Sequence, residues 1–111
     1  MEINRMEITL NALRKGVEAA NLTIAEKNAL NNLLDKLIIY YIDRYNEIEK
    51  CTDSQAYIDR NSRLISEMTD YIVSINDTIN KKNDAFCIVN MIYKEINYDE
   101  AKGRFKRKRL I

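Results

Sequence analysis

The side chains that could perform chemistry in this chain are two cysteines, 17 carboxylates and a basic run near the end, and histidine is absent. Without histidine the chain has no Ser-His-Asp or Cys-His arrangement, and it lacks the commonest general base and metal ligand. Carboxylate pairs such as Asp43 and Glu47 have the spacing of a solvated helix face. The two glycines, Gly16 and Gly103, are too far apart to form a phosphate-binding loop. We therefore predict no catalytic residue, no metal ligand and no cofactor, and a protein that is not an enzyme.

Cys51 and Cys87 are isolated in the sequence and form no CxxC pair. One disulfide is an alternative, but isolated cysteines are more typical of reduced, small hydrophobic residues, which indicates a reducing compartment. No segment approaches the roughly 18 to 20 apolar residues of a membrane span, and the N-terminus lacks the pattern of a signal peptide. The sequence thus predicts a cytoplasmic protein with no membrane partner. Heavy use of Ile, Asn and Lys suits an AT-rich genome, including that of a phage or a virus.

Six cations lie within the last ten residues and form the most distinctive local feature: Lys102, Arg104, Lys106, Arg107, Lys108 and Arg109. They leave residues 1–101 with 12 basic and 17 acidic groups, a net charge of −5, against +1 for the whole chain. Such a run can bind the phosphates of nucleic acid with a steep dependence on salt. In a eukaryotic host it would also resemble a nuclear-import signal. The alternatives are a solubilising terminus, or cations that complement the acidic body of a neighbouring subunit.

Apolar residues recur at helical spacing along most of the chain. In the first predicted helix they are Ile3, Met6, Leu10, Leu13, Val17 and Ala20. Thr23 and Glu26 can form a capping box that starts a second helix, which runs to about Lys50. The apolar stripe of this second helix is wide enough to contact two neighbours. Its members are Leu30, Leu33, Leu34, Leu37, Ile38, Tyr41, Ile42, Tyr45 and Ile48.

A third helix is predicted after the polar segment 51–54, with Thr52 or Ser54 as its cap. Its apolar residues have heptad spacing, with Asn61 as the polar residue in the seam. They are Ile58, Ile65, Met68, Ile72, Ile75 and Ile79. A buried asparagine, here Asn61 or Asn31 of the second helix, can fix helix register. Residues 80–84 then predict a turn, and the segment 85–96 is apolar nearly all round, so it is either central in the fold or buried in a partner.

These elements predict an all-α fold, an antiparallel helical bundle of about four helices. The alternative is a long helical hairpin that dimerises, because the apolar register continues without a phase slip through residues 20–24 and 79–86. We favour the bundle, since the capping box and the polar run are local stop signals. Residues 1–98 would form the helical bundle domain, and residues 99–111 a basic C-terminal tail.

Apolar surface in excess of what one core needs is the feature that points to a function. Tyr40 lies off the apolar stripe of its helix, so its ring is expected at the surface, where tyrosine is common in partner contacts. Phe86, Met91 and Tyr93 belong to the apolar segment 85–96. We predict that these four residues bind protein. The chain would be a non-enzymatic helical interaction module, such as a phage or viral inhibitor, regulator or assembly factor, that binds another protein or forms a homodimer. A small nucleic-acid-binding regulator that uses the tail is the alternative.

The segment Leu30-Asn31-Asn32-Leu33-Leu34-Asp35-Lys36-Leu37-Ile38 resembles the signature of the small helical-hairpin aspartyl-phosphate phosphatases of sporulating bacteria. That signature reads Leu-Ser-Gln-x-Leu-Asp-x-Leu-Ile. Asp35 matches its aspartate, whereas Asn31 and Asn32 replace its serine and glutamine. The stretch covers less than a third of the chain. The resemblance implies a second alternative, a phosphatase-like protein that acts on a response regulator.

Overall fold

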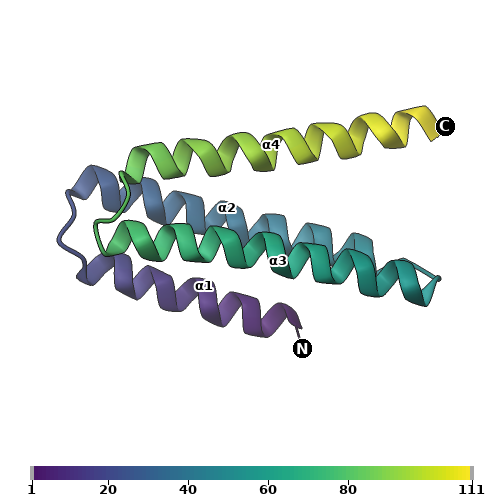
Figure 1. The fold of residues 1–111 in the computed structure, drawn as a ribbon, viewed down its shortest axis with the longest axis horizontal. Coiled ribbons are helices and arrows are strands. Elements are labelled where there is room, and N and C mark those ends of the chain that lie inside the picture. Colours follow the sequence, from purple (N-terminus) through teal and green to yellow (C-terminus); the bar gives the residue numbers. More distant parts are fainter. Residues whose placement is uncertain (1, 111) are drawn as a thin grey trace.

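Four helices follow one another along the chain in an up-and-down arrangement (Figure 1): α1 (Glu2–Ala19), α2 (Ile24–Glu49), α3 (Ser54–Ile79) and α4 (Ala85–Leu110). The structure is a computed structural model that describes the backbone of residues 2–110 and the side chains of residues 5–98 and 100. No strand occurs within the described backbone. The predicted all-α bundle of four antiparallel helices is confirmed, and the long-hairpin alternative is wrong.

The breaks between helices come from hydrogen bonds that start or end each helix locally. At the start of α2, the Thr23 hydroxyl accepts from the Glu26 amide at 3.1 Å, and the Glu26 carboxylate accepts from the Thr23 amide at 2.9 Å. This reciprocal pair satisfies two amides of the kind that a helix start leaves without a partner, and it confirms the predicted capping box. At the start of α4, the Asp84 carboxylate accepts from the amides of Phe86 and Cys87.

The start of α3 differs from the prediction. Asp53 is the N-cap, and its carboxylate accepts from the Gln55 amide at 3.2 Å. The expectation that Thr52 or Ser54 caps this helix is therefore wrong. A carboxylate and a hydroxyl can both accept this hydrogen bond. Only the carboxylate carries a negative charge, which also interacts favourably with the positive end of the helix dipole.

The end of α3 is closed by a residue in the left-handed region. Lys81 has φ 62°, and its amide donates to the Thr78 carbonyl at 3.0 Å. The next amide, that of Lys82, donates to the Asp77 carbonyl at 2.8 Å. These two bonds form a Schellman motif, in which glycine is the usual residue at the position of Lys81. The chain therefore turns towards α4 with a lysine in a conformation that favours glycine.

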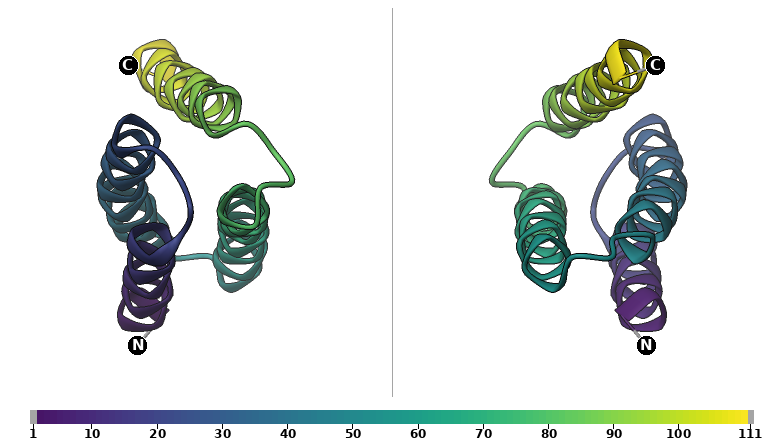
Figure 2. Two further views of the ribbon diagram at one scale, coloured as in Figure 1. Left: turned by 90° about the vertical axis from the view of Figure 1, so that its left-hand side faces the viewer. Right: turned by 90° about the vertical axis from the view of Figure 1, so that its right-hand side faces the viewer.

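The central pair of the bundle is α2 and α3. One side of this pair is covered by α1 and the other by α4, and no contact joins α1 to α4 in the described part of the chain (Figure 2). The α2 helix thus has three neighbours, which explains the width of its apolar stripe. The buried apolar core consists of Met6, Leu10, Val17, Leu30, Leu33, Leu34, Leu37, Tyr40, Tyr41, Ile48, Leu64, Met68, Tyr71, Ile75, Ala85, Val89, Ile92 and Ile96.

The buried face of α3 is rotated relative to the predicted heptad seam. Met68 and Ile75 are buried as predicted, but Ile58 is exposed, and Ile65 and Ile72 are half-buried. The other buried positions are Leu64, Tyr71 and Thr78. This rotation follows from the packing, because α3 must face α1 on one side and α4 on the other.

Asn31 and Asn61 are half-buried, and their amide oxygens have no hydrogen-bond partner among the described residues. A buried acceptor without a partner costs about 1–3 kcal/mol. Their predicted role in fixing helix register stays a prediction.

Candidate protein-binding face

Over residues 85–98, where the structure describes its side chains, the α4 helix has two largely apolar sides, and only one of them is covered. Its inner side packs into the core through four buried residues at 4-3-4 spacing: Ala85, Val89, Ile92 and Ile96. Two residues further along, the same spacing repeats at Cys87, Met91, Lys94 and Tyr98, all of which are exposed. A step of two residues turns a helix by about 200°, so this second set lies on the opposite side of α4 from the buried residues. We call these four residues the outer seam of α4.

Three of the four residues predicted to bind protein lie on α4. Met91 belongs to the outer seam and is 56% exposed, whereas Phe86 lies on the flank of the helix and is 46% exposed. Tyr93 is half-buried and packs against the core. The structure therefore leaves Phe86 and Met91 accessible to a partner, and the binding role of all three stays a prediction.

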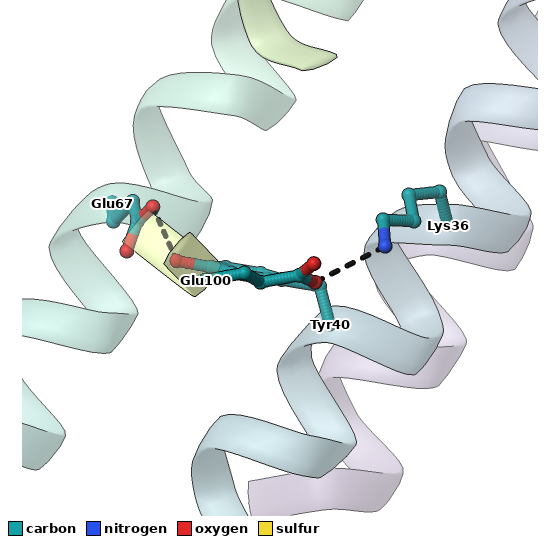
Figure 3. A network of polar contacts seen from close by, with 4 residues as sticks. All are labelled: Lys36, Tyr40, Glu67 and Glu100. Atoms are coloured by element: carbon teal, nitrogen blue, oxygen red, sulfur yellow. Dashed lines mark hydrogen bonds and ion pairs between the residues drawn. The ribbon is translucent and has the colours of Figure 1, made fainter. Parts of the chain in front are cut away.

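Tyr40 lies inside the bundle, and the expectation that its ring reaches the surface is wrong. The ring is 1% exposed, and its hydroxyl donates to Glu67 Oε2 at 2.7 Å, from α2 across to α3 (Figure 3). The guanidinium carbon of Arg44 lies 5.9 Å from the ring centre. A residue beside the main stripe of α2 is buried because α3 and α4 enclose this helix in addition to α1.

Glu67 joins two tyrosines beneath α4. The Tyr71 hydroxyl donates at 2.5 Å to the same oxygen that accepts from Tyr40. Nearby, the Lys36 ammonium of α2 pairs with the Glu100 carboxylate of α4 at 3.1 Å (Figure 3). Burial, and then the hydrogen bond to Glu67, raise the pKa of Tyr71 above its ordinary value. Its hydroxyl therefore stays a proton donor within α3, while the bond from Tyr40 to Glu67 joins α2 to α3 and the pair of Lys36 with Glu100 joins α2 to α4.

An open groove of about 490 Å³ lies between α3 and α4 beside this cluster. It is lined by Glu67, Tyr71, Lys94, Glu95 and Tyr98. Because Lys94 and Tyr98 also belong to the outer seam, the groove and the seam form one continuous surface. That surface combines apolar and aromatic side chains with charges of both signs, as protein-binding surfaces do.

The other residues considered for chemistry are spread over the bundle. Cys51 and Cys87 are not joined, and Arg60 donates to the Cys51 sulfur at 2.9 Å near the α2–α3 turn. Asp35, the residue that matches the phosphatase signature, is exposed and pairs with Arg14 at 2.6 Å. No group of three possible metal ligands occurs in the described part of the chain.

The basic run falls on the last turns of α4, whose backbone is helical to Leu110. The side chains of its six cations lie outside the described residues, so the nucleic-acid interpretation stays a prediction. Among the described helices, none has the length and hydropathy needed to cross a membrane.

Four residues of this region were not singled out from the sequence: Glu67, Tyr71, Lys94 and Glu95. The pair Glu67 and Tyr71 has the i, i+4 spacing at which side chains meet on a helix, so part of the cluster was detectable. The outer seam was also detectable as a second 4-3-4 pattern within the segment that is apolar nearly all round.

No protein-family model matches the chain, and no curated protein or solved structure matches it significantly. The phosphatase resemblance consequently rests on the residues of segment 30–38 alone.

Proposed function

We propose that this chain is a non-enzymatic helical protein–protein interaction module whose binding face is the outer seam of α4, with Phe86 on its flank and the adjoining groove. The observation that carries the proposal is the second 4-3-4 set of α4, which the fold does not cover. A helix that only completes a bundle needs one apolar face and presents a polar one to water. The α4 helix instead places a thiol, a thioether and a phenol ring on its outer side.

The distribution of exposed apolar side chains supports this assignment. Single exposed hydrophobic residues are normal on any protein. The large exposed hydrophobic residues of α1, α2 and α3 are isolated ones of this sort: Ile8, Ile24, Ile39, Ile58 and Val73. On α4 three large apolar side chains lie within 13 residues: Phe86, Met91 and Tyr98. Burying a side chain of this size in an interface contributes roughly 1.5–3 kcal/mol. These residues can together supply much of the free energy of a specific contact.

The charge and composition of the chain suggest the kind of role that such a module plays. It has no histidine and no glycine loop, and its ionisable cluster ties helices together. A regulator, an inhibitor or an assembly factor needs only a binding surface, and the composition suits a phage or virus as its source.

A capture experiment with surface variants tests the proposal. The tagged chain, the double variant Phe86→Ser/Met91→Ser and the matched control Val73→Ser are each used to capture proteins from an extract of the source organism. Val73 on α3 is 53% exposed, close to the 56% of Met91, so the control removes a similar apolar side chain elsewhere. We expect a captured protein that the α4 variant loses and the control keeps. Equal capture by all three forms would contradict the assignment.

A second candidate is a nucleic-acid-binding regulator, favoured by the six cations of the tail. Each phosphate contact made by a cation makes binding fall with rising salt. Deleting residues 102–111 should then abolish a salt-sensitive interaction with DNA or RNA. Binding that is absent, or unchanged by the deletion, would exclude this candidate.

A further inference from the structure

The α4 helix is attached to the bundle in a way that allows two chains to exchange it. It packs on α2 and α3 and makes no contact with α1 in the described part of the chain (Figure 2). The turn of residues 80–84 joins it to α3. When such a turn opens, a second chain can place its own α4 on the same surface of α2 and α3. The contacts of α4 then form between chains instead of within one chain.

The buried residues of α3 and α4 form one heptad series that runs through this turn. Each position follows the previous one by four or three residues in strict alternation, and Lys82 is the one exposed member. The series is Leu64, Met68, Tyr71, Ile75, Thr78, Lys82, Ala85, Val89, Ile92 and Ile96. An unbroken 4-3 spacing keeps these residues on one stripe of a continuous helix. The same residues therefore specify a buried face whether the turn is bent or helical.

The bent turn has a local cost that a helix would remove. Lys81 is in the left-handed region at φ 62°, where a residue with a Cβ is disfavoured and glycine is the usual residue. The chain has no proline, and neither of its glycines lies in the turn, so residues 80–84 contain no helix breaker. The join between α1 and α2 differs, because the reciprocal bonds of Thr23 and Glu26 hold its break in place.

We propose that the chain has a second state, a dimer in which two copies exchange their α4 helices. In this state α3, residues 80–84 and α4 form one continuous helix. The two long helices run antiparallel and cross at the former turns, and each α4 packs on α2 and α3 of the other chain. The closed bundle stays the state of the monomer, because one chain cannot cover its own core with a straightened α4. The outer seam lies on the opposite side of α4 from the exchanged stripe, so this inference does not depend on the proposed function.

Two features of the turn favour the closed monomer. Lys82 belongs to the exchanged stripe and lies at the crossing point, so the two Lys82 ammonium groups of a dimer approach and repel each other. The Asp84 carboxylate accepts from the amides of Phe86 and Cys87 in the closed form, and a continuous helix loses this cap. We therefore expect the exchanged dimer to be the minor state of the wild-type chain. Its share should rise with protein concentration and with salt, which screens the repulsion.

The ion pair between Lys36 of α2 and Glu100 of α4 reports the exchange directly. Its Nζ and Oε1 atoms lie 3.1 Å apart, so a water-soluble carbodiimide can join the two side chains as an amide. Equal amounts of isotope-labelled and unlabelled chain are mixed in urea, refolded together at low and at high protein concentration, and treated with this reagent. In the closed bundle the cross-link joins two peptides of the same label, whereas half of the cross-links in an exchanged dimer join a labelled to an unlabelled peptide. We expect mixed cross-links in the concentrated sample, and their complete absence there would overturn the proposal.

Variants of the turn test which residues set the balance. Lys82→Leu removes the repulsion and completes the apolar stripe, so sedimentation velocity should show a dimer at least about tenfold tighter than the wild type. The matched control Lys15→Leu changes an exposed lysine of α1 and should leave the balance unchanged. Lys81→Gly should act in the opposite direction, because glycine is favoured in the left-handed turn and disfavoured in a helix. Since each dimer contains two hinges, we expect this change to weaken dimerisation about tenfold or more.

The outcomes separate the exchanged dimer from other associations. A Lys82→Leu chain that stays monomeric, or that dimerises with every Lys36–Glu100 cross-link between peptides of one label, would contradict the exchange. Lys82→Ala removes the charge without adding a large apolar side chain, and it should shift the balance in the same direction even when the leucine variant aggregates. Mixed cross-links that Lys81→Gly leaves equally abundant would show that the turn does not become helical, and would refute the continuous helix.

Discussion

The hydroxyl of Tyr71 offers a direct test of the cluster beneath α4. In Tyr71→Phe the ring keeps its volume and its packing, so the change removes only the hydrogen bond to Glu67 at 2.5 Å. A hydrogen bond to a charged group contributes about 1.5–3 kcal/mol to stability. Because Glu67 is half-buried and keeps its bond from Tyr40, we expect a loss at the low end, about 1.5 kcal/mol. For a domain of this size that lowers Tm by on the order of 6–12 °C.

The assay is thermal and urea unfolding followed by circular dichroism, with Tyr93→Phe as the matched control. Tyr93 is a half-buried tyrosine of α4 whose hydroxyl has no hydrogen bond within the described residues, so its removal should change the free energy of unfolding by less than about 0.5 kcal/mol. If Tyr71→Phe is no more destabilising than this control, the hydrogen bond from Tyr71 to Glu67 within α3 does not stabilise the fold and the reasoning fails.

Three further predictions concern pH and the helix ends. The pKa of Tyr71 is raised by burial, and that of Tyr45 by hydrogen bonds to Glu49 and Tyr57. Because unfolded tyrosines ionise near pH 10, the free energy of unfolding should keep its full value below that pH and fall above it. A free energy of unfolding that does not change between pH 9 and 11 would contradict this prediction. Lys81→Gly relieves a left-handed residue and should raise stability by about 0.5 kcal/mol, whereas Lys82→Gly should give no gain in the same unfolding assay. Thr23→Ala removes the capping box and should lower the free energy of unfolding by about 1 kcal/mol. The control Thr52→Ala should leave it almost unchanged, and equal effects of the two changes would argue against the cap.

Local signals predicted the elements of the fold well. The four helices, the capping box at Thr23 and the turn at residues 80–84 all follow from hydrogen-bonding side chains that lie within a few positions of the break they cause. The choice of bundle over hairpin followed from the same signals, since a continuous apolar register does not override a well-formed cap. Only the identity of the cap of α3 was wrong, because three cap-forming residues follow one another there.

Which side chains are buried between helices depends on how the helices are arranged, and the sequence did not predict that arrangement. Tyr40 lies beside the main stripe of α2, and it is buried because α3 and α4 pack against α2 in addition to α1. The rotated face of α3 has the same origin. Both depend on which helices are neighbours in space, and periodicity along one helix does not contain that information.

The sequence predicted which segment holds the candidate site, but it did not predict which side of that helix is exposed. The apolar character of residues 85–96 pointed to α4, yet it did not separate the inner residues from the outer seam. That separation requires the position of the core, which places Ala85, Val89 and Ile92 inside and leaves Met91 outside.

The outer face of α4 is the surface at which we expect this protein to bind its partner. A photo-reactive amino acid placed at position 91 and, in a separate chain, at position 73 tests this most directly in cells of the source organism. We expect a protein adduct at position 91 and none at position 73, and the mass of the adduct distinguishes a second copy from another protein. Adducts at position 73 but not at position 91, or none at position 91, would contradict the claim.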